Sequence, residues 1–373
     1  MKFSVSSSDL QKKLTLAGGA ISSNPVLPIL EDFLFSIEGN QLTISATDLE
    51  TSVTTSLEVN ADGDGTVAVP ARILIDTLKA LPQQPITFSV DEDNYGIKIT
   101  SAYGSYKLAG ENGDDYPDIP QPTEDADEIS VSALALQEGI TKTLFATSTD
   151  ELRPAMTGVY FQVDFSKLIM VATDAHKLVK YSLSDIAGEV SSNFIIPKKA
   201  LNLLKGALPS TDEQVAVSFD KANAFFSFGD SKLACRLIDA RYPDYNAVIP
   251  VDNPNELLIS RTDLQQSLKR IVIYANKTTN QVILTISDGS LTVSAQDLDF
   301  SNEATEQLAC SYNGDPLTIG FNAKFLVEML GVLEGEEIKL EMSTATRAGI
   351  LLPTEQASGQ EIMMLVMPVM LSN

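Results

Sequence analysis

Three segments of the chain share one alternation of apolar and polar residues: LTISATDLETSV at 42–53, LIMVATDAHKLVKYSL at 168–183 and LTVSAQDLDFSN at 291–302. In each segment the alternation leads to a small residue, a Thr or Gln, and an Asp, which are Asp48, Asp174 and Asp297. Alternation of this kind predicts a half-buried strand, and the Asp predicts its exit turn. The three Asp residues lie 126 and 123 residues apart, so one strand and its turn recur at a fixed period.

Three further patterns recur in the same phase. A short strand that enters a helix is predicted three times, with matched Leu10, Leu136 and Leu264. A strand end and a second helix follow each time, with matched Arg72, Lys199 and Lys324. The first two repeats close on YPDIP at 116–120 and YPDYNAVIP at 242–250. Four patterns in one order indicate a triplicated domain.

The repeat predicts an α+β protein of three domains, each with two helices packed on antiparallel sheets of about eight strands. Ser7 and Ser8 are the expected N-caps of the first helix. Acidic, proline-containing segments at 121–128 and 251–256 separate the domains. The expected domains are residues 1–120, 128–250 and 256–373, and the expected helices are residues 8–21, 71–81, 133–148, 198–208, 261–277 and 323–333.

Composition narrows the class of protein. The chain of 373 residues has a formal net charge of −24, which on average repels nucleic acid. No apolar run reaches the ~18 residues of a membrane helix, and the first residues lack the apolar stretch of a signal peptide. Cys235 and Cys310 form no metal-binding or redox motif, so we expect two buried thiols in a reducing cytoplasm.

Positive charge is concentrated in the predicted helices, which hold 13 basic and 5 acidic residues. This distribution fits ordinary solvated helix faces, since Lys and Arg favour helices, and it also fits one shared surface that faces a polyanion through phosphate contacts. The basic residues are Lys12, Lys13, Arg72, Lys79, Lys142, Lys198, Lys199, Lys205, Arg261, Lys269, Arg270, Lys277 and Lys324.

Three equivalent domains in one chain suggest a closed assembly. If each domain contacts the next in the same head-to-tail way, the contact repeats by rotation and can close into a ring. Two copies of the chain would supply six near-equivalent domains. Positive helices inside such a ring and an acidic exterior would hold a duplex without reading its sequence.

Over nearly its whole length the chain resembles the bacterial DNA polymerase III beta subunit family, the sliding clamps. The resemblance rests on MKF at the start, LPIL at 27–30, ATDLE at 46–50, VPAR at 69–72, ELRPAMTGV at 151–159, ATDAHKL at 172–178, RYPDY at 241–245, GFN at 320–322 and VMPVML at 366–371. It implies three clamp domains per chain and a head-to-tail dimeric ring that slides on double-stranded DNA in the cytoplasm. It also implies a polymerase processivity factor, loaded by an ATP-dependent clamp loader.

The resemblance further implies a hydrophobic pocket between the second and third domains. The replicative polymerase, other polymerases and repair proteins would bind there through short hydrophobic peptides, and Met suits such an adaptable surface. The tail at 363–373 is equally typical of a buried last strand. The implied pocket residues are Met156, Thr173, Ala175, His176, Lys177, Leu178, Pro243, Ala247, Val248, Phe325, Thr346, Ala348, Leu365, Met367, Pro368, Val369 and Met370.

Two other sets of residues follow from the resemblance. The implied DNA contacts are Arg72, Arg153, Lys199, Lys324 and Asn24, and the implied dimer contacts are Tyr106, Leu108, Ile273 and Tyr274. The chain departs from the family at four of the implied positions. Ala175 and Lys177 replace the commoner Gly and Arg around the His, and Asn24 and Met370 stand where an Arg is often found.

Catalysis is not expected. His176 is the only histidine, which excludes a multi-His metal site, and a His-based triad is not expected. DGDG at 62–65 resembles the start of a calcium loop, but Ile73 takes the place of its final Glu. No phosphate-binding loop occurs, and no cofactor is expected. The remaining alternative is an acidic three-domain scaffold that binds only proteins and does not encircle DNA.

Overall fold

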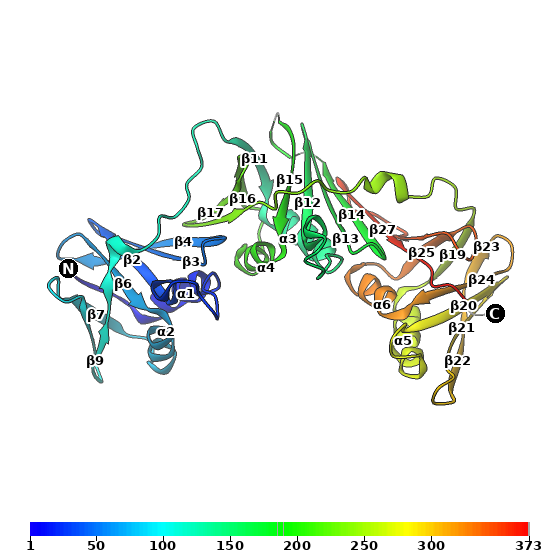
Figure 1. Cartoon of the computed structure of the whole chain (residues 1–373), viewed down its shortest axis with the longest axis horizontal. Coiled ribbons are helices and arrows are strands. Elements are labelled where there is room, and N and C mark those ends of the chain that lie inside the picture. Colours follow the sequence, from blue (N-terminus) through cyan, green and yellow to red (C-terminus); the bar gives the residue numbers. More distant parts are fainter. Residues whose placement is uncertain (185, 189, 372–373) are drawn as a thin grey trace. The chain divides into compact units, whose positions relative to one another are not determined.

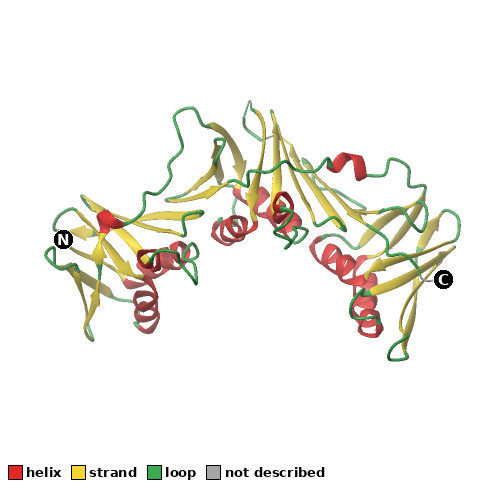
Figure 2. Cartoon of the chain, viewed as in Figure 1, coloured by secondary structure: helices red, strands yellow, loops and turns green. Residues whose placement is uncertain are grey.

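The computed structural model describes residues 1–184, 186–188 and 190–371. The chain forms two compact units, one of Met1–Gln137 with Lys199–Leu237 and one of Glu138–Lys198 with Ile238–Asn373. Each unit contains two antiparallel sheets, and its α-helices lie on one side of them (Figures 1 and 2). The chain is therefore α+β and antiparallel, as predicted.

The first unit has a five-stranded and a nine-stranded sheet. The five-stranded sheet contains, in spatial order, β5 (Asn60–Ala61), β1 (Lys2–Ser6), β7 (Pro85–Val90), β8 (Gly96–Ser101) and β9 (Gly104–Ala109). The nine-stranded sheet contains β10 (Glu111–Asn112), β6 (Gly65–Pro70), β2 (Asp32–Glu38), β3 (Gln41–Thr47), β4 (Thr51–Glu58), β18 (Ser231–Arg236), β17 (Asn223–Phe228), β16 (Gln214–Phe219) and β11 (Asp127–Ser132).

The second unit has a nine-stranded and a four-stranded sheet. The nine-stranded sheet contains β15 (Ser191–Pro197), β12 (Gly158–Asp164), β13 (Lys167–Thr173), β14 (Lys177–Ser184), β27 (Gln360–Val366), β26 (Gly349–Pro353), β25 (Glu337–Met342), β19 (Asn255–Ser260) and β23 (Ser311–Asn313). The four-stranded sheet contains β22 (Asn302–Ala309), β21 (Ser290–Asp297), β20 (Gln281–Ser287) and β24 (Leu317–Asn322).

Six α-helices occur in the described part of the chain: α1 (Ser7–Gly18), α2 (Ala71–Ala80), α3 (Ala133–Leu144), α4 (Lys198–Ala207), α5 (Arg261–Ile271) and α6 (Ala323–Val332). Their apolar faces have the helical period, as in α1, where Leu10, Leu14 and Ala17 are fully buried. The helices α1 and α2 pack on each other, as do α5 and α6. Among the described residues no helix is long and apolar enough to cross a membrane.

Three sequence predictions about helix ends are wrong. The first helix begins at Ser7, and Ser6 occupies the cap position without a side-chain cap bond; Ser7 is buried, and its hydroxyl bonds to Pro82 O and Gln84 N instead. The helix α3 ends at Leu144 because the chain then turns back, with Ser148 N donating to Met156 O. The helix α5 ends at Ile271 and continues as one 3₁₀ turn, η5 (Val272–Tyr274).

The prediction of two buried thiols is also only half right. Cys235 is buried in β18, and burial raises the pKa of its thiol to about 12. Cys310 follows β22 and is partly exposed. A residue that directly follows an edge strand has fewer covering neighbours than one in a central strand, which explains the difference.

The predicted Asp turn recurs in the same form in the first two repeats but not in the third, where Asp297 Oδ1 accepts from Asp299 N at 3.2 Å and the left-handed residue is Ser301. Asp48 Oδ1 accepts hydrogen bonds from Glu50 N and Thr51 N, at 3.0 and 2.7 Å. One repeat later, Asp174 Oδ1 accepts from His176 N and Lys177 N, both at 2.9 Å. In these first two repeats the residue after the Asp has a left-handed backbone, with φ of 78° at Leu49 and 76° at Ala175.

Candidate functional site

The strands β14, β27 and β26 are neighbours in one sheet and lie beneath the predicted partner surface; we call them the β14–β27 floor. In their antiparallel register Leu178 lies opposite Leu365, and Leu365 lies opposite Ile350. These three side chains belong to one buried cluster, whose other members are Val171, Ile195, Tyr242, Tyr245 and Ala348. The floor is thus a continuous apolar layer drawn from several strands and from the segment that ends in the short helix η4 (Tyr245–Val248).

The chain after β27 forms one side of this surface. Met367 N donates to His176 O at 2.9 Å, and Val369 N donates to Gly320 O at 2.8 Å. These bonds hold the segment against the turn after β13 and against β24. The side chain of Met367 remains 39% exposed and that of Met370 70% exposed. The tail is therefore both a last strand and, beyond it, a segment that presents methionines to solvent.

Val248 adds a third exposed apolar side chain. It ends η4 and is 54% exposed, while Tyr245 at the start of η4 is buried in the cluster. Tyr242 stacks on Tyr160 with 4.6 Å between ring centroids, and its hydroxyl donates to Val171 O. The buried tyrosines therefore fix the segment that exposes Val248.

Lys177 ties the turn after β13 to α6. Its side chain is 6% exposed, and its ammonium group lies 2.9 Å from Asp174 and 3.3 Å from Glu328. The same group lies 4.3 Å from the ring centroid of Phe325, in cation–π contact. His176 stacks on Phe325 with 6.3 Å between centroids. A buried cation is stable only with such partners, so Lys177 has a structural role beside the exposed His176.

The structure brings many of the predicted pocket residues together. Leu178, Ala348 and Leu365 share the buried cluster, and His176, Lys177 and Phe325 contact one another. Met156 follows Ala155, which packs against the cluster. The sequence reasoning missed Tyr242, Tyr245 and Ile350; the two tyrosines stand in the YPDY motif, which was a usable signal.

The predicted DNA-binding residues fall into two groups. Arg72 in the first turn of α2 and Lys324 in the first turn of α6 are exposed, and no ion pair joins either to an acid within the described residues. Arg153 is paired with Asp150 at 2.8 Å. Lys199 is paired with Asp48 and also donates to Ala20 O at 3.2 Å. Asn24 is exposed.

The positive charge of the helices is partly neutralised. The six helices hold twelve basic and five acidic residues. Lys13 pairs with Asp230 and Arg270 with Glu306, and both acids lie outside the helices. The Arg270 guanidinium donates two bonds of 2.7 Å and holds the pKa of the Glu306 carboxyl below its usual value. Only part of the basic charge is thus available to a polyanion.

The predicted dimer residues lie beside two terminal strands. Tyr106 and Leu108 are half-buried on β9, which ends the five-stranded sheet. Ile273 and Tyr274 are 62% and 44% exposed on η5, which lies against β22, the end strand of the four-stranded sheet. Unpaired strand edges with apolar neighbours are typical of surfaces that pair with another chain.

Comparison with known proteins gives one consistent result. The N-terminal, central and C-terminal domains of the DNA polymerase III beta subunit match residues 1–120, 130–244 and 246–369. The chain is 29% identical over 381 residues to the Beta sliding clamp of Synechococcus elongatus, with full coverage of both.

Solved structures agree over the same length. The DNA polymerase sliding clamp from Bacillus subtilis is 27% identical with a TM-score of 0.94, and both chains are fully covered. The sliding clamp from Bartonella birtlesii, solved bound to griselimycin, is 30% identical with a TM-score of 0.92, again with full coverage of both. The similarity therefore extends to all three repeats.

Proposed function

The chain belongs to the DNA polymerase III beta subunit family, the sliding clamps that serve as DNA polymerase processivity factors, and we propose from its structure how it closes, holds DNA and recruits partners. Three clamp domains lie along the chain, and their boundaries at residues 1–120, 128–250 and 256–373 remain our proposal. Membership of this family does not favour the acidic scaffold that avoids DNA.

The proposal that two chains close into a ring rests on strands that pair between neighbouring repeats. The strand β4 of the first repeat pairs with β18 of the second, and β14 of the second pairs with β27 of the third. The equivalent strands that remain are β22 in the third repeat and β9 in the first, and each lies at the end of its sheet. We infer that β22 pairs with β9 of a second copy, so that two chains close head to tail.

The repeat also supplies the register of that pairing. The strand β22 pairs with β21 as β4 pairs with β3, so β22 and β4 are equivalent strands of two repeats. In the same way β9 forms a hairpin with β8 as β18 does with β17, so β9 and β18 are equivalent. Val53 lies opposite Leu233, and the equivalent residues are Ala304 and Tyr106. Both of these are half-buried, so the register places inward-facing side chains opposite each other, as a sheet requires.

The neighbouring pair in this register is charged. Glu303 lies opposite Lys107 of the second copy, and both side chains are exposed. Within its own sheet Lys107 lies opposite Lys98, a repulsive arrangement that an opposing Glu relieves. Tyr106 and Leu108 of the second copy lie on the inward side, where Ile273 and Tyr274 of the first copy supply apolar contacts.

DNA binding rests on exposed basic residues of the helices. Arg72 and Lys324 are the strongest candidates because they are exposed and no ion pair engages them within the described residues. Arg153 and Lys199, each paired with an acid, and the uncharged Asn24 contribute more weakly. Phosphate contacts carry no base information, so the ring holds any duplex and slides along it. Many weak contacts that exchange with counterions permit this movement.

Partner binding rests on the surface over the β14–β27 floor. Val248, His176, Met367 and Met370 present exposed side chains there, and two relatives were solved bound to griselimycin. We propose that short hydrophobic segments of the replicative polymerase, the clamp loader and repair proteins bind this surface. A tethered polymerase rebinds intramolecularly at high effective concentration, which gives processivity without catalysis by the clamp or a cofactor. Its place of action is the cytoplasm.

Charge reversal tests the closure. Lys107→Glu places like charges opposite Glu303 and is expected to weaken the dimer about tenfold, since attraction becomes repulsion at a cross-strand pair worth up to ~1 kcal/mol. The mass measured by light scattering then falls from about twice 40.2 kDa towards one chain on dilution. Glu303→Lys is expected to weaken the dimer to the same extent. The two changes together restore opposite charges and are expected to restore the dimer. Lys221→Glu, in an exposed turn, is the control. A double variant as weak as the singles would contradict the register.

A further inference from the structure

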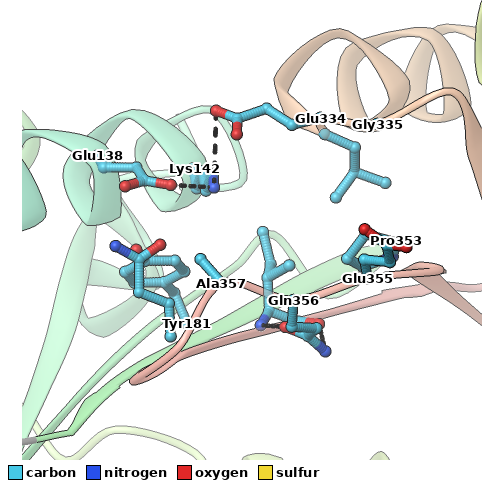
Figure 3. Close-up of a pocket in the computed structure, with 12 residues that line it drawn as sticks. Glu138, Lys142, Tyr181, Glu334, Gly335, Pro353, Glu355, Gln356 and Ala357 are labelled. Carbon is cyan, nitrogen blue, oxygen red and sulfur yellow. Dashed lines mark hydrogen bonds and ion pairs between the residues drawn. The ribbon is translucent and has the colours of Figure 1, made fainter.

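A cavity in the second unit contains none of the residues assigned above to partner or dimer contacts, and none of the five predicted DNA contacts. It has a volume of about 290 Å³ and lies among α3, β14, the end of α6 and the segment that leads into β27 (Figure 3). Leu333, Pro353 and Ile362 give it apolar walls. The Gln356 amide fixes one wall, because it donates to Ile362 O and accepts from Ile362 N.

The charged groups of the cavity are unbalanced. Lys142 is 8% exposed, and its ammonium group contacts Glu138 closely and Glu334 at 4.0 Å (Figure 3). Glu355 also lines the cavity, and within the described residues no ion pair engages it. The lining therefore has three carboxylates and one ammonium group. Glu138 neutralises Lys142, and Glu334 and Glu355 are left to attract a further positive charge.

Tyr181 supplies a second, independent sign of a missing ligand. Its side chain lines the cavity and is 1% exposed, and within the described part of the chain its hydroxyl has no hydrogen-bond partner. Buried polar groups are nearly always hydrogen-bonded, and one left unpaired is costly. Burial, and then the charges of Glu138 and Glu334, raise the pKa of this phenol. The group stays neutral, and because less than 1 Å² of its oxygen is accessible, it accepts a hydrogen bond from a ligand only after the ring or the groups that cover it shift.

We propose that this cavity binds an alkylguanidinium or alkylammonium cation, its charged head between Glu334 and Glu355 with Tyr181 Oη as an acceptor, and its stem along the apolar wall. A guanidinium suits the site because it donates up to five hydrogen bonds and is only weakly hydrated. An anion would face three carboxylates. A metal ion is not expected, because the described residues contain no cluster of three His, Cys, Asp or Glu that fits one.

Two probes that differ only in charge test the site. N-acetyl-arginine amide is expected to bind the full-length chain saturably by calorimetry, and to shift the NMR signals of Tyr181 but not those of Tyr245. N-acetyl-citrulline amide has the same shape without the charge and is expected to bind at least tenfold more weakly. Equal binding of the two probes would overturn the proposal.

Variants assign the binding to this cavity. Glu334→Gln and Glu355→Gln are each expected to weaken the arginine probe about fivefold, the effect of one exposed ion pair. Glu336→Gln, an exposed Glu on the same loop that does not line the cavity, is the matched control. Tyr181→Phe keeps the ring and the charges but removes the acceptor, and is also expected to weaken binding. Affinity unchanged in all three cavity variants would sink the idea.

The cation can come from a protein or from a free amine. Spermidine and a short arginine-containing peptide, titrated in parallel, distinguish these sources, since both carry the required head and stem. Tighter peptide binding would assign the site to an arginine of a partner, and tighter spermidine binding to a free polyamine. Failure of both would reject the site. The dimer mass and duplex binding are independent of these outcomes, because Glu334, Glu355 and Tyr181, the cavity residues that are changed, belong to neither surface.

Discussion

Ala175 has a backbone conformation that L-residues seldom adopt. Its φ of 76° lies in the left-handed region, where a Cβ costs roughly 1 kcal/mol or more relative to glycine. Two backbone N–H groups bonded to Asp174 hold this turn. The turn leaves His176 exposed and directs its carbonyl to Met367. A Gly would adopt this backbone without strain, and Ala is tolerated because several hydrogen bonds hold the turn.

Asp32 is a buried acid whose ionisation opposes folding. Burial, and then the charges of Glu111 and Glu31, raise the pKa of its carboxyl to about 6. The carboxyl of Asp32 therefore keeps its proton up to about pH 6 in the folded chain but loses it near pH 4 in the unfolded chain. Because the folded state binds this proton more tightly, the free energy of unfolding falls as pH rises from about 4 to 6. Asp32→Asn removes this ionisation, so the variant is expected to gain stability over wild type as pH rises. The difference in free energy of unfolding between variant and wild type is expected to be about 2–3 kcal/mol larger at pH 7 than at pH 4.

Denaturant unfolding at a series of pH values measures this difference. The exposed Glu58→Gln is the control, because it changes the charge by the same amount without burial. A difference between the Asn variant and wild type that does not change with pH would contradict the role assigned to Asp32.

The exposed apolar side chains over the β14–β27 floor are expected to determine partner affinity. Val248→Ala and Met367→Ala each remove about 1–2 kcal/mol of apolar contact. Binding of a short hydrophobic peptide of the proposed partner type, measured by calorimetry, is therefore expected to weaken about tenfold in each variant. Val26→Ala is the matched control, since Val26 is also exposed, at 75%, and lies in the other unit. Equal affinities of Val248→Ala and wild type would remove Val248 from the partner surface.

At the scale of elements, the helices set how the chain responds to salt. Each phosphate that a basic side chain neutralises adds about 0.9 to the steepness of log affinity against log salt. Arg72→Ala and Lys324→Ala are each expected to reduce the slope for duplex DNA by about one. Lys199→Ala is expected to reduce it less, because Asp48 already engages that lysine. A titration from about 50 to 200 mM salt measures these slopes, and a larger reduction for Lys199→Ala than for Arg72→Ala would contradict the assignment.

The order of helices and strands was predictable from the sequence, because the residues that are apolar in the local pattern are the ones buried in the fold. The alternation in residues 42–53 and 168–183 places β3, β4, β13 and β14, and the helical period places Leu10 and Leu74 inward. Helix ends were not predictable, because Ser7 is bonded to a distant segment, residues 82–84. Ion pairs such as Lys199 with Asp48, 151 residues apart, were likewise invisible to local pattern.

At the scale of the molecule, the sequence predicted the number of repeats but not how the repeats join. The strand pairs β4–β18 and β14–β27 are as continuous as pairs within a repeat, so the compact units divide the middle repeat between them. That continuity is a long-range pairing, which no local window of sequence contains. It also leaves β9 and β22 at the ends of their sheets without the equivalent partner, which is the basis of the closure proposed above.

Retention on DNA tests the central claim that the chain acts as a closed ring. The protein is loaded on a nicked circular plasmid by its clamp loader with ATP, isolated by gel filtration, and the plasmid is then cut once. A topological link predicts loss of the protein on cutting and retention when bound proteins block both ends. Equal retention on circular, cut and end-blocked DNA would contradict the account, because it would mean that contacts alone hold the protein.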